Sequence, residues 1–135
     1  MGMIQRDYVL RLIQQLAQAL ARIAGLKRSG QLDEALDDVG TTLDDLLGPL
    51  RQTLDAIDAR SAARLLTDRE RIEAYALLSA EEASILELIG NTTRAGQRAQ
   101  RALALLLEAQ MLGHTLSADA QKTLAELRHQ GEDAL

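Results

Sequence analysis

Three arginine side chains fall at a helical spacing that suits the binding of an anion. Arg94, Arg98 and Arg101 lie within about 60° of one another around a helix, with no acidic residue between them. A guanidinium group can hold a carboxylate or a phosphate through two parallel hydrogen bonds. This stripe is our candidate binding site for a carboxylate, a phosphate or an acidic segment of a partner. Two other interpretations stay open: the stripe is a solvated helix flank, or it pairs with the acidic segment 33–45 of the same or a neighbouring chain.

Acidic residues in the segment 33–45 are the weak candidates for a metal site. Glu34, Asp37 and Asp38 carry the oxygen ligands that divalent cations prefer. Coordination needs ligands that converge from several directions, however, and carboxylates on one exposed helix diverge. The segment is better explained as a solvated face that keeps the protein in solution. We expect no bound metal and no cofactor.

Two histidines, His114 and His129, are the side chains that could exchange protons near neutral pH. His114 follows Gly113 in an expected turn, and His129 stands near the end of the last helix, where a cation suits the helix dipole. Neither comes with an identifiable serine nucleophile and a carboxylate to orient it. The sequence has no cysteine, which excludes thiol nucleophiles, disulfides and cysteine zinc sites. We therefore assign no catalytic residue and expect a protein that is not an enzyme.

The composition of the 135 residues favours helices throughout. Leucine and alanine supply 49 of the 63 hydrophobic residues, whereas valine and isoleucine, which favour strands, supply nine. A net charge of −5 and only two aromatic residues argue against nucleic-acid binding. The longest apolar run has six residues, far short of the roughly 18 that span a bilayer. Residues 1–7 lack the order of a signal peptide, so we expect a cytoplasmic protein that binds neither nucleic acid nor membrane.

The spacing of the apolar residues predicts one all-α domain built from two antiparallel helical hairpins. Each hairpin joins two helices through a tight polar turn, the first at Ser29 and Gly30 and the second at 90–93. The segment between the hairpins has a weaker apolar period, typical of two short helices or of one broken helix. The predicted elements in residues 1–135 are hairpin one at 4–47, a connector at 50–66, hairpin two at 68–113 and a C-terminal helix at 118–130.

Two capping-box patterns bear on the first helix of the second hairpin. Thr67 and Glu70 have the Ser/Thr-x-x-Glu spacing, which predicts that this helix opens at Asp68. The same spacing recurs at Ser79 and Glu82 and would indicate a break in mid-helix. Because the apolar period passes through Ser79 without a phase shift, and no glycine or proline lies nearby, we favour an unbroken helix.

The first helix carries an apolar arc of about 200°, wider than one core face needs. This width predicts neighbours on two sides of the helix, and a second copy of the chain could supply one of them. The residues that we assign to such a homodimer interface are Val9, Leu12, Leu16, Ala19, Ile23 and Leu26. Tyr8 and Tyr75 are predicted to lie in the core or at its edge, with their hydroxyls hydrogen-bonded.

Small residues across the hairpin turns resemble those of a tetratricopeptide repeat. In the first hairpin, Gly30, Ala35 and Val39 match the turn and second-helix positions of that repeat. In the second hairpin, Ala99 and Leu103 match the later positions, and the matching small turn residue is replaced by Arg94. The aromatic first-helix positions of the repeat are missing from both hairpins.

The run Asp7-Tyr8-Val9-Leu10-Arg11-Leu12-Ile13 carries a second resemblance. Together with the Ala35 helix and the helix from Ala99 to Leu107, it resembles an uncharacterised bacterial family of small all-helical proteins, a domain of unknown function. The resemblance covers about residues 4–112. It implies a tetratricopeptide-like helical fold in a bacterial cytoplasm, and it brings no catalytic residues.

These observations favour a non-enzymatic, helical-repeat-like module for protein–protein interaction or scaffolding. The supporting features are the repeat-like hairpins, the missing catalytic constellation and the segregated charge. The alternative is a helical sensor that binds a small molecule or a phosphorylated metabolite, and a metal-dependent hydrolase ranks below it. A closed cavity with convergent polar groups would favour the small molecule, whereas a solid core beneath an exposed concave face would favour a protein partner.

Overall fold

The leucines and alanines with helical spacing form seven α-helices in the computed structural model. The structure describes residues 2–133 and the side chains of residues 6–131. The helices are α1 (Gly2–Arg28), α2 (Leu32–Leu47), α3 (Leu50–Ala56), α4 (Ala59–Leu66), α5 (Arg69–Ile89), α6 (Thr92–Met111) and α7 (Ala118–Asp133). No strand occurs among the described residues, so the prediction of an all-α fold is confirmed. Residues 1, 134 and 135 of the expected domain lie outside the described part of the chain. Within residues 2–133, no helix has both the length and the apolar character to cross a membrane.

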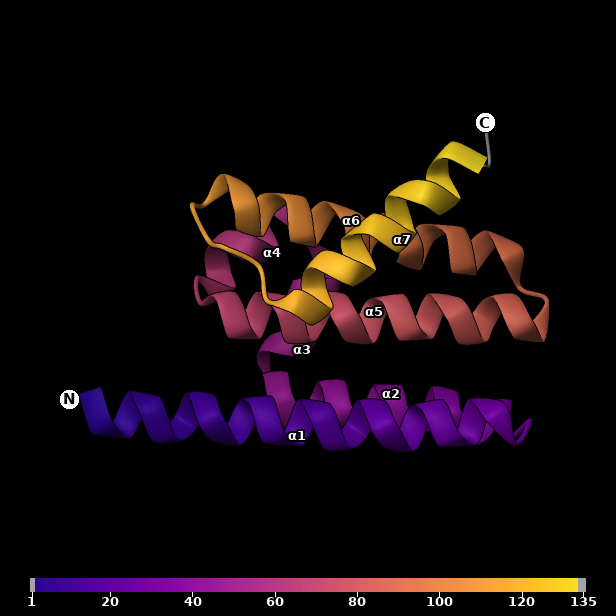
Figure 1. Ribbon diagram of the computed structural model, residues 1–135, viewed down its shortest axis with the longest axis horizontal. Helices are drawn as coiled ribbons and strands as arrows, with labels where there is room; N and C mark the ends of the chain where they lie inside the picture. Colours follow the sequence, from indigo (N-terminus) through magenta and orange to yellow (C-terminus); the bar gives the residue numbers. More distant parts are fainter. Residues whose placement is uncertain (1, 134–135) are drawn as a thin grey trace.

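Two hairpins stack on each other to form the body of the protein. α1 pairs with α2 in one hairpin, α5 pairs with α6 in the other, and α5 packs against both helices of the first hairpin (Figure 1). The short helices α3 and α4 connect the hairpins, and α4 lies against α6. α7 crosses α5 and α6 diagonally (Figure 1). The elements therefore follow the predicted order of hairpin, connector, hairpin and final helix.

Both hairpin turns use a glycine in the left-handed region of backbone conformation. Gly30 has a φ of +76° and Gly90 has a φ of +100°, where a residue with a Cβ atom would be strained. In each turn the residue after the glycine donates its N–H to a carbonyl five positions earlier, at 2.9 Å. This pattern satisfies the last carbonyls of the helix and ends it. The first predicted turn is confirmed, and the second is confirmed at Gly90 and Asn91, since α6 already begins at Thr92.

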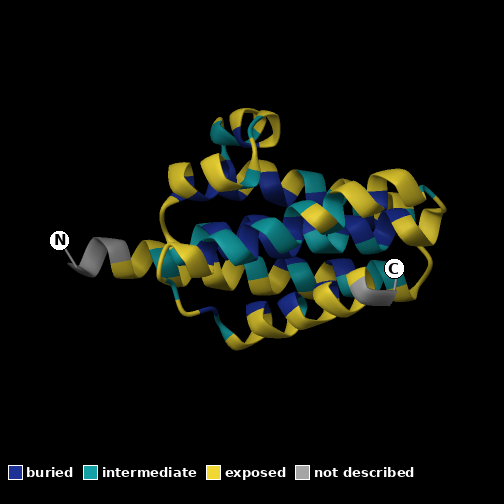
Figure 2. Cartoon of the chain, turned by 90° about the horizontal axis from the view of Figure 1, so that it is seen from above, coloured by how far each residue is buried: buried dark blue, intermediate teal, exposed yellow. Residues whose placement is uncertain are grey.

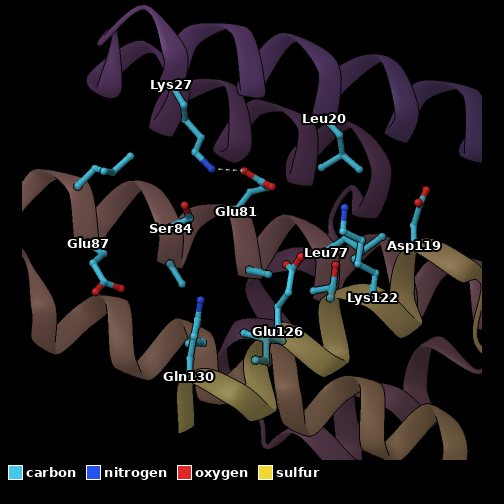
Figure 3. A pocket seen from close by; sticks show the side chains of 16 residues that line it. Leu20, Lys27, Leu77, Glu81, Ser84, Glu87, Asp119, Lys122, Glu126 and Gln130 are labelled. Carbon is cyan, nitrogen blue, oxygen red and sulfur yellow. Dashed lines mark hydrogen bonds and ion pairs between the residues drawn. The ribbon is translucent and has the colours of Figure 1, made fainter. Parts of the chain in front are cut away.

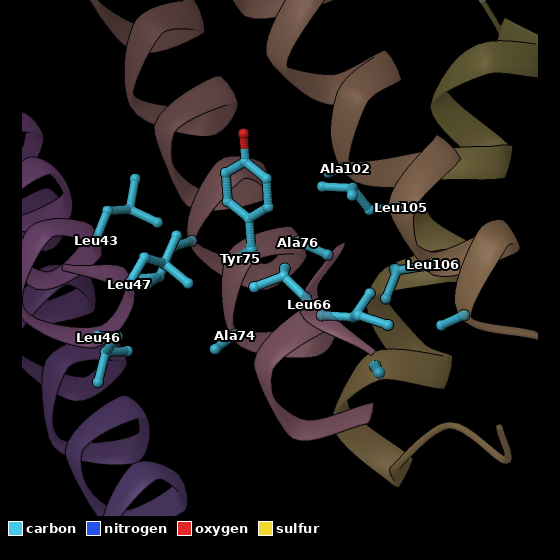
Figure 4. Packing of buried hydrophobic residues seen from close by; sticks show 14 of the residues in the cluster. Leu43, Leu46, Leu47, Leu66, Ala74, Tyr75, Ala76, Ala102, Leu105 and Leu106 are labelled. Carbon is cyan, nitrogen blue, oxygen red and sulfur yellow. The ribbon is translucent and has the colours of Figure 1, made fainter. Parts of the chain in front are cut away.

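The core lies around α5, the central helix. Figure 2 shows the buried residues on the faces where the helices meet and the exposed residues on the outside. Tyr75 on α5 is fully buried between Leu43 and Leu47 of α2 and Ala102 and Leu105 of α6 (Figure 4). Buried alanines on α5 and α6 let these two helices approach closely. The predicted burial of Tyr75 is confirmed.

α1 contacts α2 on one side and α5 on another, and these helices cover part of its wide apolar arc, whereas Ile13 stays 45% exposed. The residues assigned to a homodimer interface divide into the buried Leu12, Ala19 and Ile23 and the half-buried Val9, Leu16 and Leu26. The assignment of the three buried residues is corrected, because the neighbours that the arc requires belong to the same chain. The prediction for Tyr8 is wrong, because this side chain is 46% exposed.

The start of α5 differs from the prediction by one residue. Thr67 has a φ of +67° and ends α4, and its Oγ1 donates to the carbonyl of Arg64 at 3.1 Å, so it does not cap α5. Asp68 takes the N-cap position without a side-chain hydrogen bond, and the helix opens at Arg69. The predicted continuity through Ser79 is confirmed, since α5 is one unbroken helix.

The connector matches one of its two predicted forms, whereas the last helix is longer than predicted. Residues 50–66 form two short helices, which was one of the two alternatives. Asp58 caps the second of them, α4, by accepting a hydrogen bond from the backbone N–H of Ser61 at 2.6 Å. α7 continues past the predicted end at residue 130 to Asp133, because Gly131 keeps a helical conformation.

Candidate functional site

The arginine stripe on α6 is engaged with partners inside the protein. Arg98 Nε lies 3.1 Å from Glu82 Oε2, and Arg98 Nη2 lies 3.3 Å from Ser79 Oγ and 4.0 Å from Asp55 Oδ1. Glu82 is only 8% exposed. Arg94 Nη2 lies 4.0 Å from the same Glu82 oxygen, and its side chain is 56% exposed. Arg98 is therefore an internal partner of α5, while Arg94 stays at the surface.

Arg101 fastens the connector to the second hairpin. Its guanidinium group donates hydrogen bonds to the carbonyl of Ile57 at 2.6 Å, to the carbonyl of Leu54 and to Tyr75 Oη at 3.2 Å. The guanidinium carbon also lies 5.5 Å from the centre of the Tyr75 ring, within range of a cation–π interaction. Leu54 and Ile57 belong to the C-terminal end of α3, where backbone carbonyls lack helical partners. The Leu54 carbonyl also accepts a hydrogen bond from the backbone N–H of Ile57 at 3.4 Å. Arg101 therefore supplies a donor to the Ile57 carbonyl and a second donor to that of Leu54.

These contacts correct the expected binding role of the stripe. Arg98 and Arg101 direct their donors at internal acceptors, so neither presents a free guanidinium group to an anion. Their partners come from α5 and from the connector, and not from the acidic segment 33–45 that the sequence left as an alternative. Arg94 keeps an exposed side chain but lacks the two neighbours that would complete a site.

Tyr75 and Asp55 form the inner end of the same polar network. Tyr75 Oη donates a hydrogen bond to Asp55 Oδ1 at 2.5 Å. Burial raises the pKa of Tyr75, and the hydrogen bond to Asp55 raises it further, because both favour the protonated phenol. Tyr75 therefore acts as a hydrogen-bond donor near neutral pH. The sequence carries no signal for this network, because its acidic members Asp55 and Glu82 stand far apart along the chain.

The acidic face of α2 faces α1 and the solvent. Asp38 is held by Arg22 of α1, whose Nε and Nη2 donate to its two carboxylate oxygens at 3.0 Å each. This hydrogen-bonded pair holds the pKa of Asp38 below its usual value, and a hydrogen bond from Thr42 adds to the effect. Glu34 and Asp37 are exposed. Among the side chains that the structure describes, no three acidic or histidine side chains come together as metal ligands.

His114 connects two loops. Its Nε2 lies 2.8 Å from the carbonyl oxygen of Thr67, so the loop after α6 is joined to the turn before α5. His129 lies on the exposed side of α7. These positions give His114 a structural contact at the predicted turn.

A groove of about 700 Å³ lies between α1, α5 and α7 (Figure 3). Its floor is formed by apolar and small side chains of α5, including Leu77 and Ser84. Leu20 and Lys27 of α1 form one wall. The other wall is one face of α7, with Asp119, Lys122, Thr123, Glu126 and Gln130. The groove therefore combines an apolar floor with charged walls.

Acidic groups outnumber basic groups in the lining of the groove. Lys27 Nζ lies 3.1 Å from Glu81 Oε2 and joins α1 to α5 across one end (Figure 3). Three further carboxylates belong to Glu87, Asp119 and Glu126, and Lys122 is the second cation. The electrostatic potential of the groove is therefore negative on balance.

Glu73 fixes the position of the α7 wall. This carboxylate is 6% exposed, and it accepts hydrogen bonds from the backbone N–H of Ser117 at 3.0 Å and from Ser117 Oγ at 2.6 Å. Arg69 Nη1 adds a hydrogen bond to the carbonyl of Thr115 at 3.1 Å. The apolar stripe of α7 is buried below and consists of Ala120, Leu124 and Leu127. The polar face of α7 is thereby turned toward the groove.

A smaller cavity of about 150 Å³ extends the groove along α1. The two cavities share Leu20, Leu77 and Asp119, so they lie next to each other along α1. Leu12, Ile13 and Leu16 of α1 line the extension. The α1 side of this extension is therefore apolar, while Arg69, Glu70 and Glu73 of α5 line its other side.

No family model, curated protein sequence or solved structure matches this chain in the comparisons. The class of protein is therefore defined by its own geometry: an all-α protein of two stacked hairpins, with a groove on the face that α1, α5 and α7 share.

Two sequence signals belong to this groove. Lys27 and Lys122 are the only lysines of the chain, and both line the groove. The other cationic side chains are arginines, and most of these lie elsewhere in the protein. Asp119, Lys122 and Glu126 also repeat at helical spacing on the side opposite the buried stripe of α7. Neither signal indicates a groove until the placement of α7 against α1 and α5 is known.

Proposed function

We propose that the protein is a non-enzymatic module that binds a segment of a protein partner in the groove between α1, α5 and α7. The observation that carries this proposal is the shape of the site, a groove open along one side and lying over a filled core. Small-molecule sites usually enclose most of their ligand. An open groove between helices is better suited to a segment of polypeptide.

The arrangement of the hairpins supports a tetratricopeptide-like interaction module. α1 and α5, the first helices of the two hairpins, line one face together with α7, so successive units present one continuous surface. The charged walls suit specific recognition of a partner more than turnover of a substrate. Among the described residues, the lining of the groove includes no histidine for proton transfer.

The setting that we propose is the cytoplasm of a bacterium. This setting is implied by the resemblance at residues 7–13 to a bacterial family of helical proteins. Within it, the module would hold or assemble a partner without changing it chemically.

Selection of random peptides on the wild-type protein, followed by NMR mapping of the bound peptide, tests this function. We expect amide shifts to concentrate on the groove side of α5 and α7, around Ser84 and Glu126, and to spare the outer face of α2 near Asp37. A protein that selects no peptide, or one whose shifts fall on α2, would contradict the proposal.

A further inference from the structure

The groove points to a partner of one chemical kind. We propose that it receives a basic amphipathic helix, a segment with one apolar face and with lysine or arginine on its flanks. This inference rests on the proposed function and specifies its partner. Three properties carry it: the absence of strand edges and aromatic groups from the described walls, the length of the groove with its apolar α1 side, and the excess of carboxylates.

The form of the occupant follows from what the walls offer. Extended peptides that add to a sheet need an exposed strand edge, and the described residues contain no strand. Proline-rich segments dock on aromatic side chains, and the lining includes neither Tyr8 nor Tyr75, the two aromatic residues of the chain. A helix that lays its apolar face into a groove needs neither a strand edge nor aromatic walls, so the walls fit this mode of peptide recognition.

The groove has the length of about four helical turns. The groove and the adjoining smaller cavity together follow α1 from Leu12 to Lys27, which at 1.5 Å per residue is about 22 Å. At the Leu12 end, Ile13 is 45% exposed although its side chain is large and apolar. Apolar residues of a partner helix, spaced three and four positions apart, would cover this end.

Carboxylates predominate in the larger cavity. The lining of the larger cavity holds four carboxylates, of Glu81, Glu87, Asp119 and Glu126, and two lysines. Lys27 is already paired with Glu81. Among the described residues, the carboxylates of Glu87, Asp119 and Glu126 form no hydrogen bond or ion pair, so they are available to a partner's cations. The net charge of −5 would also steer a basic segment toward the protein.

The test is a selection among helical peptides whose charge is free to vary. A library of peptides of about 16 residues keeps leucine at helical spacing and varies the flanking positions among lysine, glutamate, glutamine and alanine. We expect selection on the wild-type protein to enrich peptides of net positive charge, whose affinity falls as the salt concentration rises. Enrichment of neutral or acidic peptides, or no enrichment, would overturn the proposal.

Two matched variants locate the effect of charge. Glu87→Gln with Glu126→Gln neutralises two exposed carboxylates of the groove, and Glu34→Gln with Asp37→Asn makes the same change on the exposed face of α2. An enriched peptide should bind the first variant roughly threefold to tenfold more weakly than it binds the wild type. It should bind the second within about twofold. Equal binding to all three proteins would overturn the role of the groove carboxylates.

The outcomes separate this proposal from the proposed function. Peptides that bind in the groove without a basic preference contradict the basic helix and leave the interaction module standing. A failure to select any peptide contradicts both. A second copy of the chain is a different possible occupant of the groove, and sedimentation of the free protein tests for it. If the wild type is a dimer and the Ser84→Trp variant is a monomer, a second copy covers the groove, and the proposal is overturned.

Discussion

Glu73 and Ser117 tie the beginning of α7 to the central helix. The Glu73 carboxylate accepts hydrogen bonds from the backbone N–H and the hydroxyl of Ser117, at 3.0 Å and 2.6 Å. The Ser117 hydroxyl in turn accepts a hydrogen bond from the backbone N–H of Ala120 at 3.2 Å and so caps α7. One buried carboxylate thus orients the helix that forms a wall of the groove.

Removal of the Glu73 carboxylate should loosen that wall. In Glu73→Ala, both donors of Ser117 lose their acceptor, so we expect the free energy of unfolding to fall by about 1–3 kcal/mol. Hydrogen exchange should accelerate in α7 more than in α2, because α7 loses its attachment. Urea unfolding and hydrogen-exchange mass spectrometry measure the two effects.

Glu70 provides the control for this variant. Its carboxylate lies on the same helix and pairs with Arg69 at 3.3 Å in a more exposed position. Glu70→Ala should therefore lower the free energy of unfolding by less than about 1 kcal/mol. Exchange that accelerates equally in α2 and α7 after the Glu73→Ala change would contradict the anchoring role.

The arginines of α6 should differ sharply in their effect on stability. Arg101→Ala removes the donor of the Ile57 carbonyl, one of two donors of the Leu54 carbonyl and a hydrogen bond to Tyr75, so we expect a loss of about 2–4 kcal/mol in the free energy of unfolding. Arg94→Ala removes an exposed side chain 4.0 Å from Glu82, and its effect should stay below about 1 kcal/mol. Urea unfolding of the two variants gives the comparison. An equal or larger loss in Arg94→Ala would show that the connector does not depend on Arg101.

The raised pKa of Tyr75 makes stability depend on alkaline pH. The folded state holds the phenol proton more tightly than the unfolded state does, where the pKa is near its usual value of about 10. This contribution is therefore complete below about pH 10 and is lost as the pH rises through the folded-state pKa. We expect wild-type stability to fall faster above about pH 10 than that of Tyr75→Phe, which lacks the phenol.

Unfolding in urea at a series of pH values measures this difference. Parallel profiles for the wild type and Tyr75→Phe would be inconsistent with a buried, hydrogen-bonded phenol.

The order of the helices could be predicted because it depends on local signals. The apolar period marks each helix, and Gly30 and Gly90 mark the hairpin turns by their conformational freedom. Thr67 shows where such signals fail, because a capping-box spacing does not reveal that the preceding helix ends at the same residue. The bounds of helices were therefore predicted to within a few residues, and the cap was not.

The side-chain partners could not be predicted, since they depend on which distant segments the fold brings together. The spacing of Arg98 and Arg101 indicates a shared helix face, but only the packed connector supplies the carbonyls that Arg101 meets. In the same way, the wide arc of α1 indicates neighbours without telling whether they belong to the same chain. Ile23 is covered by the chain's own helices.

Occlusion of the groove tests its binding role most directly. Ser84 of α5 lies in the groove (Figure 3), and Ser84→Trp would place a large indole there. Thr41→Trp puts the same side chain on the exposed face of α2 and serves as the control. The measurement is the dissociation constant of a peptide selected on the wild type, with circular dichroism to verify that each variant is folded. We expect Ser84→Trp to bind at least about tenfold more weakly and Thr41→Trp to bind as the wild type does, whereas wild-type affinity in a folded Ser84→Trp protein would contradict binding in the groove.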